Sequence, residues 1–201
     1  MVVGIDEVGR GAWAGPVTVA AVVAAPSHLR GVRDSKMLAR PERRAAAERV
    51  LAWSPAVAVA HASHDECDEL GMTAALRLAG HRALADLARQ GYEPDRVVLD
   101  GNHDYLGLGT RCTTVVKGDA TVLTVAAASC VAKVTRDRLM AEEAESFPAF
   151  DFQSNVGYPA PVHKVALAGY GPTAIHRRSW AFMGWLSHWG GLPAPAGRLF
   201  A

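Results

Sequence analysis

The sequence predicts an α/β protein, because short apolar, β-favouring runs alternate with longer segments of helical pattern. A chain of 201 residues is long enough for one sizeable hydrophobic core and short for two. We therefore expect one domain over residues 1–189, including a C-terminal helical part, and a flexible tail over residues 190–201. Strands are expected at 1–5, 17–25, 56–62, 96–100 and 113–116, and helices at 41–51, 65–89 and 121–145.

Composition excludes several classes of protein. Lysine and arginine total 21 against 20 acidic residues, so net charge predicts neither a histone-like binder nor an acidic tail protein. Any contact with nucleic acid must come from local clusters of charge. Three cysteines without a Cys-x-x-Cys pair argue against a disulfide framework or a zinc ribbon and fit a reducing cytoplasm. With no leader and no apolar stretch near 18 residues, we expect a cytoplasmic protein without a membrane span.

The first strand leads into the most informative stretch of the chain. Asp6 and Glu7 follow the apolar run 1–5, and buried charges at the end of a strand need a partner. Because side chains alternate along a strand, the two carboxylates can converge only if the strand ends or bends between them. Gly9 and Gly11 make such a bend easy and let the backbone approach a ligand, while Arg10 is placed to contact a phosphate or sugar. The alternative is a turn with solvated charges.

The run 17–25 is expected to pair with 1–5 as a neighbouring antiparallel strand, both in the centre of the sheet. The tripeptide Asp34-Ser35-Lys36 then precedes a helix that begins near Pro41. A capped loop is the simpler interpretation of that tripeptide. We interpret His61 and His64 as surface histidines, since no third nitrogen or sulfur ligand accompanies them at a known spacing.

A second carboxylate, Asp100, ends the strand 96–100 and precedes a glycine, as Asp6 ends the first strand. Functional groups gather at the carboxyl ends of strands in α/β sheets, so adjacent strands would bring Asp6 and Asp100 to one site. An Asp-Gly turn is the alternative. Asp119 stands where a helix cap is expected, a role that is compatible with metal binding. Ser129, Lys133 and either Arg136 or Asp137 share one helical face, which is either a local ion pair or a face toward the site.

The last third of the chain, residues 150–186, is rich in aromatic residues and in glycine and proline breaks. These breaks predict short helices packed beside the sheet. The segment contains Gly157-Tyr158-Pro159 and His176-Arg177-Arg178-Ser179-Trp180, where cations for phosphates stand next to rings for stacking. The segment is therefore a candidate nucleic-acid surface.

Several of these stretches together resemble the signatures of ribonuclease HII. The first match is Asp6-Glu7-Val8-Gly9-Arg10-Gly11 with the Ala-Gly-Pro that follows, and the longest runs from Lys117-Gly118-Asp119 to Asp137. Asp34-Ser35-Lys36, Gly157-Tyr158-Pro159 and the residues around Arg177 also match, so the resemblance covers nearly all of the chain. The sequence departs from the family pattern at Ala39, Gly71, Ala160 and Trp180.

The resemblance implies a ribonuclease H-like fold, a five-stranded mixed sheet flanked by helices with a small C-terminal helical extension. It implies an endonuclease that hydrolyses the RNA strand of RNA/DNA hybrids and nicks DNA duplexes at embedded ribonucleotides, leaving 5′-phosphate and 3′-hydroxyl ends. Asp6, Glu7, Asp100 and Asp119 would be the catalytic ligands of Mg²⁺ or Mn²⁺, two ions with substrate bound. Their hard oxygen atoms favour these ions over zinc.

Substrate contacts are expected from Gly9, Arg10, Gly11, Lys36, Tyr158 and Arg177. Lysine and arginine would meet phosphates, and the resemblance assigns the tyrosine ring to the sugar beyond the ribonucleotide. We expect a monomer. Two other classes stay open: a different two-metal nuclease or integrase of the same fold, and a non-catalytic nucleic-acid-binding module. The second would not need four carboxylates that repel phosphates unless metal is present.

Overall fold

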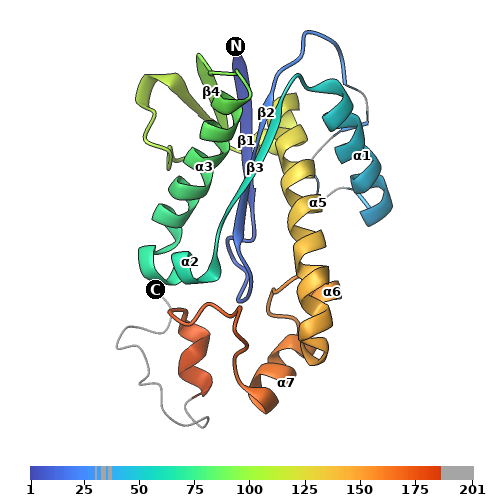
Figure 1. The fold of residues 1–201 in the computed structure, drawn as a ribbon, viewed down its shortest axis with the longest axis vertical. Coiled ribbons are helices and arrows are strands. Elements are labelled where there is room, and N and C mark those ends of the chain that lie inside the picture. Colours follow the sequence, from blue (N-terminus) through green and yellow to red (C-terminus); the bar gives the residue numbers. More distant parts are fainter. Residues whose placement is uncertain (30, 33–34, 36–37, 187–201) are drawn as a thin grey trace.

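The computed structural model describes residues 1–29, 31, 32, 35 and 38–186. Its centre is one five-stranded mixed sheet with strand order β3-β2-β1-β4-β5 (Figure 1), which confirms the predicted fold class. Strands β1 to β3 pair antiparallel, whereas β1, β4 and β5 run parallel. The strands are β1 Val2–Val8, β2 Val17–Val23, β3 Val57–Ala62, β4 Arg96–Asp100 and β5 Cys112–Val115.

Helices cover both faces of the sheet, which Figure 1 shows nearly edge-on. Helices α2 and α3 lie on one side and α1 and α5 on the other, while α6 and α7 lie beyond the end of β1. The α-helices are α1 Arg40–Trp53, α2 His64–Leu70, α3 Met72–Arg89, α4 Gly118–Thr121, α5 Leu123–Ser146, α6 Phe152–Asn155 and α7 Pro161–Tyr170. Short 3-10 turns occur at Gly109–Arg111, Pro148–Phe150 and Ala181–Leu186.

One helix predicted as continuous is divided. The predicted helix 65–89 breaks at Gly71, whose φ of +77° does not fit an α-helix, so α2 and α3 are separate. The helix predicted over 121–145 is confirmed as α5, and the short α4 precedes it, separated by extended backbone at Val122.

The hydrophobic core has one layer on each face of the sheet. Val3, Ile5 and Leu99 pack against α3, whereas Ala20 and Val22 pack against α1 and α5. On this second face the contacting residues of α5 are mostly alanine, and a Cβ on Gly4 would collide with Thr124. Helix α5 therefore lies very close to β1. Within the described residues, no helix is long and apolar enough to span a membrane.

A third apolar cluster builds the C-terminal part, as the sequence predicted. Phe150, Phe152 and Phe182 are buried there with Met140 from the end of α5. The Trp13 ring stacks on Phe182 with centroids 4.4 Å apart, which fastens the loop after β1 to this cluster. Packing thus brings the glycine-rich loop and the C-terminal helices together beside the sheet.

Candidate active site

Strand β1 carries two carboxylates in the middle of the sheet. It continues to Val8, and Asp6 and Glu7 pair with Ala20 and Val19 of β2. The prediction that the strand ends or bends between the two acids is therefore wrong. Because side chains alternate along a regular strand, Asp6 points to the α5 face and Glu7 to the α3 face.

Asp100 lies next to Asp6, near the carboxyl ends of the two adjacent parallel strands β4 and β1. Ile5 pairs with Leu99 in parallel register, so Asp6 and Asp100 follow at the same level of two adjacent strands. The Asp100 Oδ1 accepts a hydrogen bond of 2.7 Å from the amide of Gly118, the first residue of α4. This bond brings the start of α4, and with it Asp119, to the carboxyl end of β4.

Asp119 is buried, with 4% of its surface exposed. It is the second residue of α4 and not its cap, because the cap position belongs to Lys117. The predicted capping role is therefore wrong. Lys117 has a φ of 56°, a left-handed conformation that is unfavourable for a residue with a side chain. Strain of this kind is common at functional sites, and here it turns the chain so that Gly118 meets Asp100.

Burial and mutual repulsion disfavour the charged forms of the β1 carboxylates. Burial raises the pKa of Asp6 to about 8, with further contributions from the charges of Glu7 and Asp100, against the hydrogen bond from the Ser129 hydroxyl. The pKa of Glu7 is also raised, mainly by burial and partly by Asp100, although Arg10 at 3.6 Å opposes this. These acids hold more negative charge than their surroundings compensate.

The same carboxylates fit a divalent cation. The Oε2 atom of Glu7 is buried and has no hydrogen-bond partner in the described part of the chain. Hard oxygen atoms with uncompensated charge are the ligands that Mg²⁺ and Mn²⁺ prefer. Among the residues described, however, no three acidic, histidine or cysteine side chains already surround one ion-sized position. The acids form a negatively charged edge rather than a finished coordination shell.

The turn after β1 holds the glycines in contact with the C-terminal part. Gly9 has a φ of +88°, and a Cβ there would collide with Arg136, so glycine is required for internal packing. A Cβ on Gly11 would lie 3.8 Å from the ring of Tyr158. Arg10 projects outward with 63% of its side chain exposed. The structure therefore brings together Gly11 and Tyr158, two of the expected substrate contacts, and leaves Arg10 accessible.

Arg177 does not lie where a phosphate can reach it, which corrects its predicted role. Its side chain is fully buried, and its guanidinium group donates hydrogen bonds to the carbonyl oxygens of Gly9, Arg10 and Gly15 at 2.7 to 3.1 Å. Burial lowers its pKa from the usual range. The Trp180 ring packs 5.2 Å from the guanidinium carbon. Arg177 thus holds the glycine-rich loop in place from inside.

Arg136 is a second buried arginine that holds the same region. It donates to the carbonyl oxygens of Ala14, Pro16 and Val156 at 2.8 to 3.0 Å, and its guanidinium carbon lies 5.7 Å from the centre of the Tyr158 ring. Val156 has a φ of 47°, which a β-branched residue rarely adopts. Arg136 therefore connects the loop after β1 to a strained turn that presents Tyr158.

The sequence left open whether the α5 face with Ser129 and Lys133 forms a local ion pair or faces the site, and the structure shows that different residues do each. Lys133 and Asp137 form a local ion pair of 2.7 Å, whereas Ser129 faces the site beside Asp6. The Ser129 hydroxyl also lies 2.9 Å from that of Ser35, which fixes Ser35 near β1. Lys36 lies outside the described residues.

The sequence analysis missed Tyr105, which gave no motif signal. Its hydroxyl is buried without a hydrogen-bond partner among the described residues, and burial, with Glu7 and Asp6, raises its pKa well above the usual value. It faces the β1 carboxylates from the α3 side. His61 and His64 are both partly exposed, and His61 shares a 2.8 Å hydrogen bond with Thr18.

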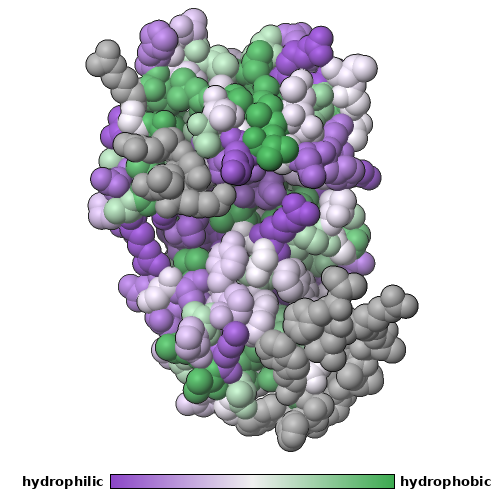
Figure 2. Space-filling view, turned by 180° about the vertical axis from the view of Figure 1, so that it is seen from behind, coloured by the Kyte–Doolittle hydropathy of each residue, from purple (hydrophilic) through white to green (hydrophobic). Residues whose placement is uncertain are grey.

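Seen from behind, the molecule has a hollow at mid-height between the sheet and the C-terminal part, with hydrophilic residues gathered around it (Figure 2). Carboxylates at the ends of adjacent central strands, beside a glycine-rich loop that a ligand can approach closely, are typical of a ribonuclease H-like fold. Comparisons support this class. The ribonuclease HII of Archaeoglobus fulgidus, solved with PCNA, aligns with a TM-score of 0.76 and 27% identity over 93% of this chain and 97% of that chain. The Pyrococcus horikoshii ribonuclease H2 aligns with a TM-score of 0.75, at 26% identity and the same coverage.

The ribonuclease HII family profile matches residues 3–183. The ribonuclease HII of Streptomyces avermitilis is 52% identical over 190 residues, which cover 94% of this chain and 80% of the relative. That of Streptomyces griseus is 54% identical with the same coverage. The chain belongs to the ribonuclease HII family. It is a metal-dependent hydrolase of the ribonuclease H type, an endonuclease.

Proposed function

We propose that the protein hydrolyses the RNA strand of RNA/DNA hybrids and nicks DNA duplexes at embedded ribonucleotides. The observation that carries the proposal is the placement of Asp6 and Asp100 at the same level of adjacent parallel strands, with Glu7 next to them. Burial and mutual repulsion disfavour the bare charges of these carboxylates, so a cation that neutralises them would bind there, and a cation beside a phosphate provides the means to cleave it.

Asp6, Glu7, Asp100 and Asp119 are the residues that would hold Mg²⁺ or Mn²⁺, two ions with substrate bound. Such ions supply Lewis-acid chemistry: they favour ionisation of a water molecule and stabilise the leaving oxygen in an in-line displacement. A related Bst-RNase HIII, 22% identical with a TM-score of 0.72, was solved in complex with Mn²⁺. That likeness is one of fold, and the donor atoms of this chain support the choice of metal.

The chain itself contributes binding and orientation. The Asp6 Oδ1 accepts from the Glu7 amide at 2.8 Å, and the Asp100 Oδ1 from Gly118, so both carboxylates are fixed before substrate arrives. Attack by a water molecule leaves no covalent intermediate with the protein. With the 3′-oxygen as the leaving group, the water oxygen stays on phosphorus, and the products are a 5′-phosphate and a 3′-hydroxyl.

Recognition of the ribonucleotide is assigned to Tyr158 and to Arg10 and Gly11, which lie in the loop whose conformation Gly9 makes possible. The 2′-hydroxyl is the direct handle that distinguishes RNA from DNA, and it needs polar groups at close range. Gly11 permits backbone approach beside the Tyr158 ring, and a tyrosine there would pack against a sugar that lacks this hydroxyl. Together these residues would recognise an RNA-to-DNA junction. Lys36 remains assigned to a phosphate.

We further propose that the protein acts as a monomer in the cytoplasm. The direct test of its activity is cleavage, with Mg²⁺ or Mn²⁺, of a DNA duplex that contains one ribonucleotide, compared with an RNA/DNA hybrid and an all-DNA duplex. We expect cuts in the first two substrates and none in the third. Asp100→Asn serves as the matched control and should cut none of them. Equal cleavage of the all-DNA duplex would reject the proposal.

A further inference from the structure

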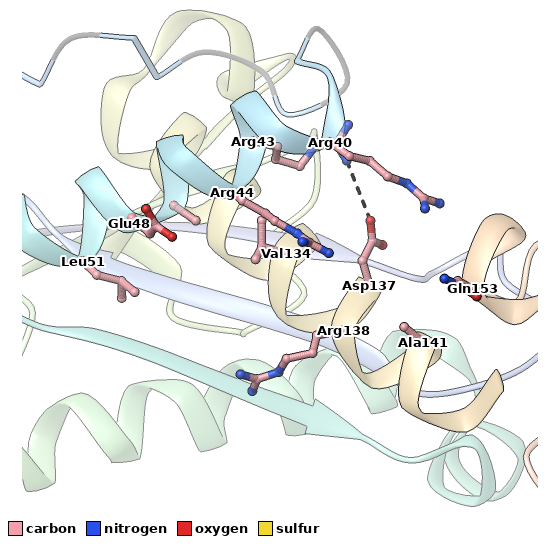
Figure 3. Close-up of a pocket in the computed structure, with 11 residues that line it drawn as sticks. Arg40, Arg43, Arg44, Glu48, Leu51, Val134, Asp137, Arg138, Ala141 and Gln153 are labelled. Carbon is pink, nitrogen blue, oxygen red and sulfur yellow. Dashed lines mark ion pairs between the residues drawn. The ribbon is translucent and has the colours of Figure 1, made fainter. Parts of the chain in front are cut away.

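A groove outside the site lies between α1 and α5 and encloses about 430 Å³. Figure 3 shows Arg44 reaching from α1 across this space above Val134, while Arg40 extends toward Gln153. Small or apolar side chains also line the groove: Ala47, Leu51, Val134 and Ala141. Four arginines line it: Arg40, Arg43, Arg44 and Arg138.

Positive charge in the groove exceeds negative charge. Among the described residues, only Glu48 and Asp137 contribute carboxylates to its lining, and Asp137 already pairs with Lys133 at 2.7 Å and Arg43 at 3.7 Å. Arg138 has a loose pair of 3.7 Å with the exposed Glu142. Surface pairs at such distances contribute little. Arg43 is engaged by Asp137 and by the carbonyl oxygens of Ser35 and Leu38. The exposed Arg44 and Arg138 therefore provide most of the anion-binding surface, which a nucleic-acid backbone complements.

Helix α5 and Arg43 connect the groove to the active site. Ser129, beside Asp6, and Asp137, in the groove, are eight residues apart on α5, about 12 Å along the helix axis. Arg43 lines the groove and also donates to the carbonyl oxygen of Ser35 at 2.8 Å, next to Ser129. A backbone that passes Asp6 reaches the arginines after three to four base-pair steps of about 3.4 Å each.

The same end of the groove, at the start of α1, also approaches the turn that presents Tyr158. Arg40 donates to the carbonyl oxygen of Ser154 in α6 at 2.8 Å, and Asn155 at the end of this helix accepts from the Tyr158 amide through its carbonyl oxygen at 3.0 Å. The start of α1 is therefore tied both to the loop beside Ser129 and to the segment that presents Tyr158.

We propose that this arginine groove, defined by Arg40, Arg43, Arg44 and Arg138, binds phosphates of the duplex about three to four base pairs from the bond that is cleaved. The inference rests on the proposed function, since it extends the same substrate. The groove adds affinity and orientation without base contacts, so it is indifferent to sequence.

The test uses Arg44→Ala and Arg138→Ala, with Arg89→Ala as the matched control, because Arg89 is an exposed arginine at the end of α3 on the opposite face of the sheet. Binding is measured against salt concentration for a duplex with a central ribonucleotide, in an Asp6→Asn background that leaves the substrate uncut. Each groove variant should reduce the slope of log affinity against log salt by about one and weaken binding roughly threefold to tenfold at low salt.

Two further substrates place the ribonucleotide about two base pairs from one end or the other of the duplex, so that one flank cannot reach the groove. One of these two substrates should bind more weakly than the substrate with a central ribonucleotide. On that substrate, the groove variants should bind with the same affinity as the protein with an intact groove. A salt slope equal to that of Arg89→Ala, or equal losses on all three substrates, would overturn the inference. Binding of a free mononucleotide in the groove, with no change in the salt slope of duplex binding in the groove variants, would also overturn the inference.

The two proposals fail separately. If the wild-type protein cleaves no ribonucleotide substrate but its duplex binding keeps the flank-dependent slope, the proposed hydrolysis is wrong and the groove stands. If cleavage occurs and the slope does not respond to Arg44→Ala or Arg138→Ala, the groove is wrong and the hydrolysis stands. Thermal midpoints of all variants confirm that each is folded.

Discussion

Replacing Arg177 with lysine is expected to destabilise the protein rather than to weaken its contact with phosphates. The guanidinium group satisfies three buried carbonyl oxygens, those of Gly9, Arg10 and Gly15, from three nitrogen atoms. A lysine keeps the charge but concentrates its donors on one atom at the end of a stem that cannot span the three acceptors. Two buried carbonyl groups would then lose their partners.

The size of the effect follows from that count. An unsatisfied buried polar group costs about 1–3 kcal/mol, so with two such groups the Arg177→Lys protein should lose about 2–6 kcal/mol of its free energy of unfolding. At about 2–4 °C per kcal/mol for a chain of this length, the thermal midpoint should fall by about 4–24 °C. Such a loss is a large fraction of the stability of a typical domain, about 5–15 kcal/mol.

Urea unfolding of wild type and Arg177→Lys gives the free energies directly. Arg178→Lys is the matched control, because Arg178 is the exposed neighbour and should change stability by less than about 0.5 kcal/mol. Duplex binding by a folded fraction of Arg177→Lys should keep the wild-type salt slope. A variant as stable as wild type whose slope falls by about one would refute the argument and return Arg177 to phosphate contact.

Three other predictions test separate parts of the molecule. Asp6→Asn should abolish cleavage, and near-normal turnover would remove Asp6 from the site. Without metal, the variant should be as stable as wild type or more stable above about pH 7, because the raised pKa of Asp6, about 8, makes folded wild type lose stability as pH rises from about 4 to about 8. Tyr158→Ala should lose far more activity on a single embedded ribonucleotide than on a long hybrid, with metal binding retained, and equal losses would end its role at the junction. Burial and the neighbouring His163 lower the pKa of His176 to about 3. In the Asp6→Asn background, which removes the opposing titration of Asp6, thermal midpoints should therefore fall as pH drops below about 6.5, where the unfolded chain takes up the proton first, and a flat profile between about pH 7 and 5 would contradict this.

Much of the fold could be predicted because local patterns and sheet pairing agree. Strands β1 and β4 are apolar runs that each lead to a carboxylate, and their parallel pairing places Asp6 beside Asp100. The limits of β1 could not be predicted, because hydrophobicity ends at Ile5 whereas backbone pairing continues to Val8. Pairing depends on the partner strand, which a single stretch of sequence does not show.

The site was less predictable where tertiary packing decides a residue's role. Arg177 and an exposed arginine have the same chemistry in sequence, and only the buried position against the carbonyl oxygens of the glycine-rich loop distinguishes them. Gly9 was expected to admit a ligand, but its missing Cβ leaves room for Arg136. Tyr105 follows β4 in a loop without a motif, so its position beside Glu7 depends entirely on the fold.

The most direct measurement is the identity of the ends produced from a DNA duplex with one embedded ribonucleotide. Hydrolysis by water at the carboxylate edge predicts a 3′-hydroxyl on one fragment and a 5′-phosphate on the other, with no products from Asp6→Asn. Attack by the ribonucleotide's own 2′-hydroxyl would instead leave a 2′,3′-cyclic phosphate. Cyclic ends, or unchanged cleavage by Asp6→Asn, would contradict the account.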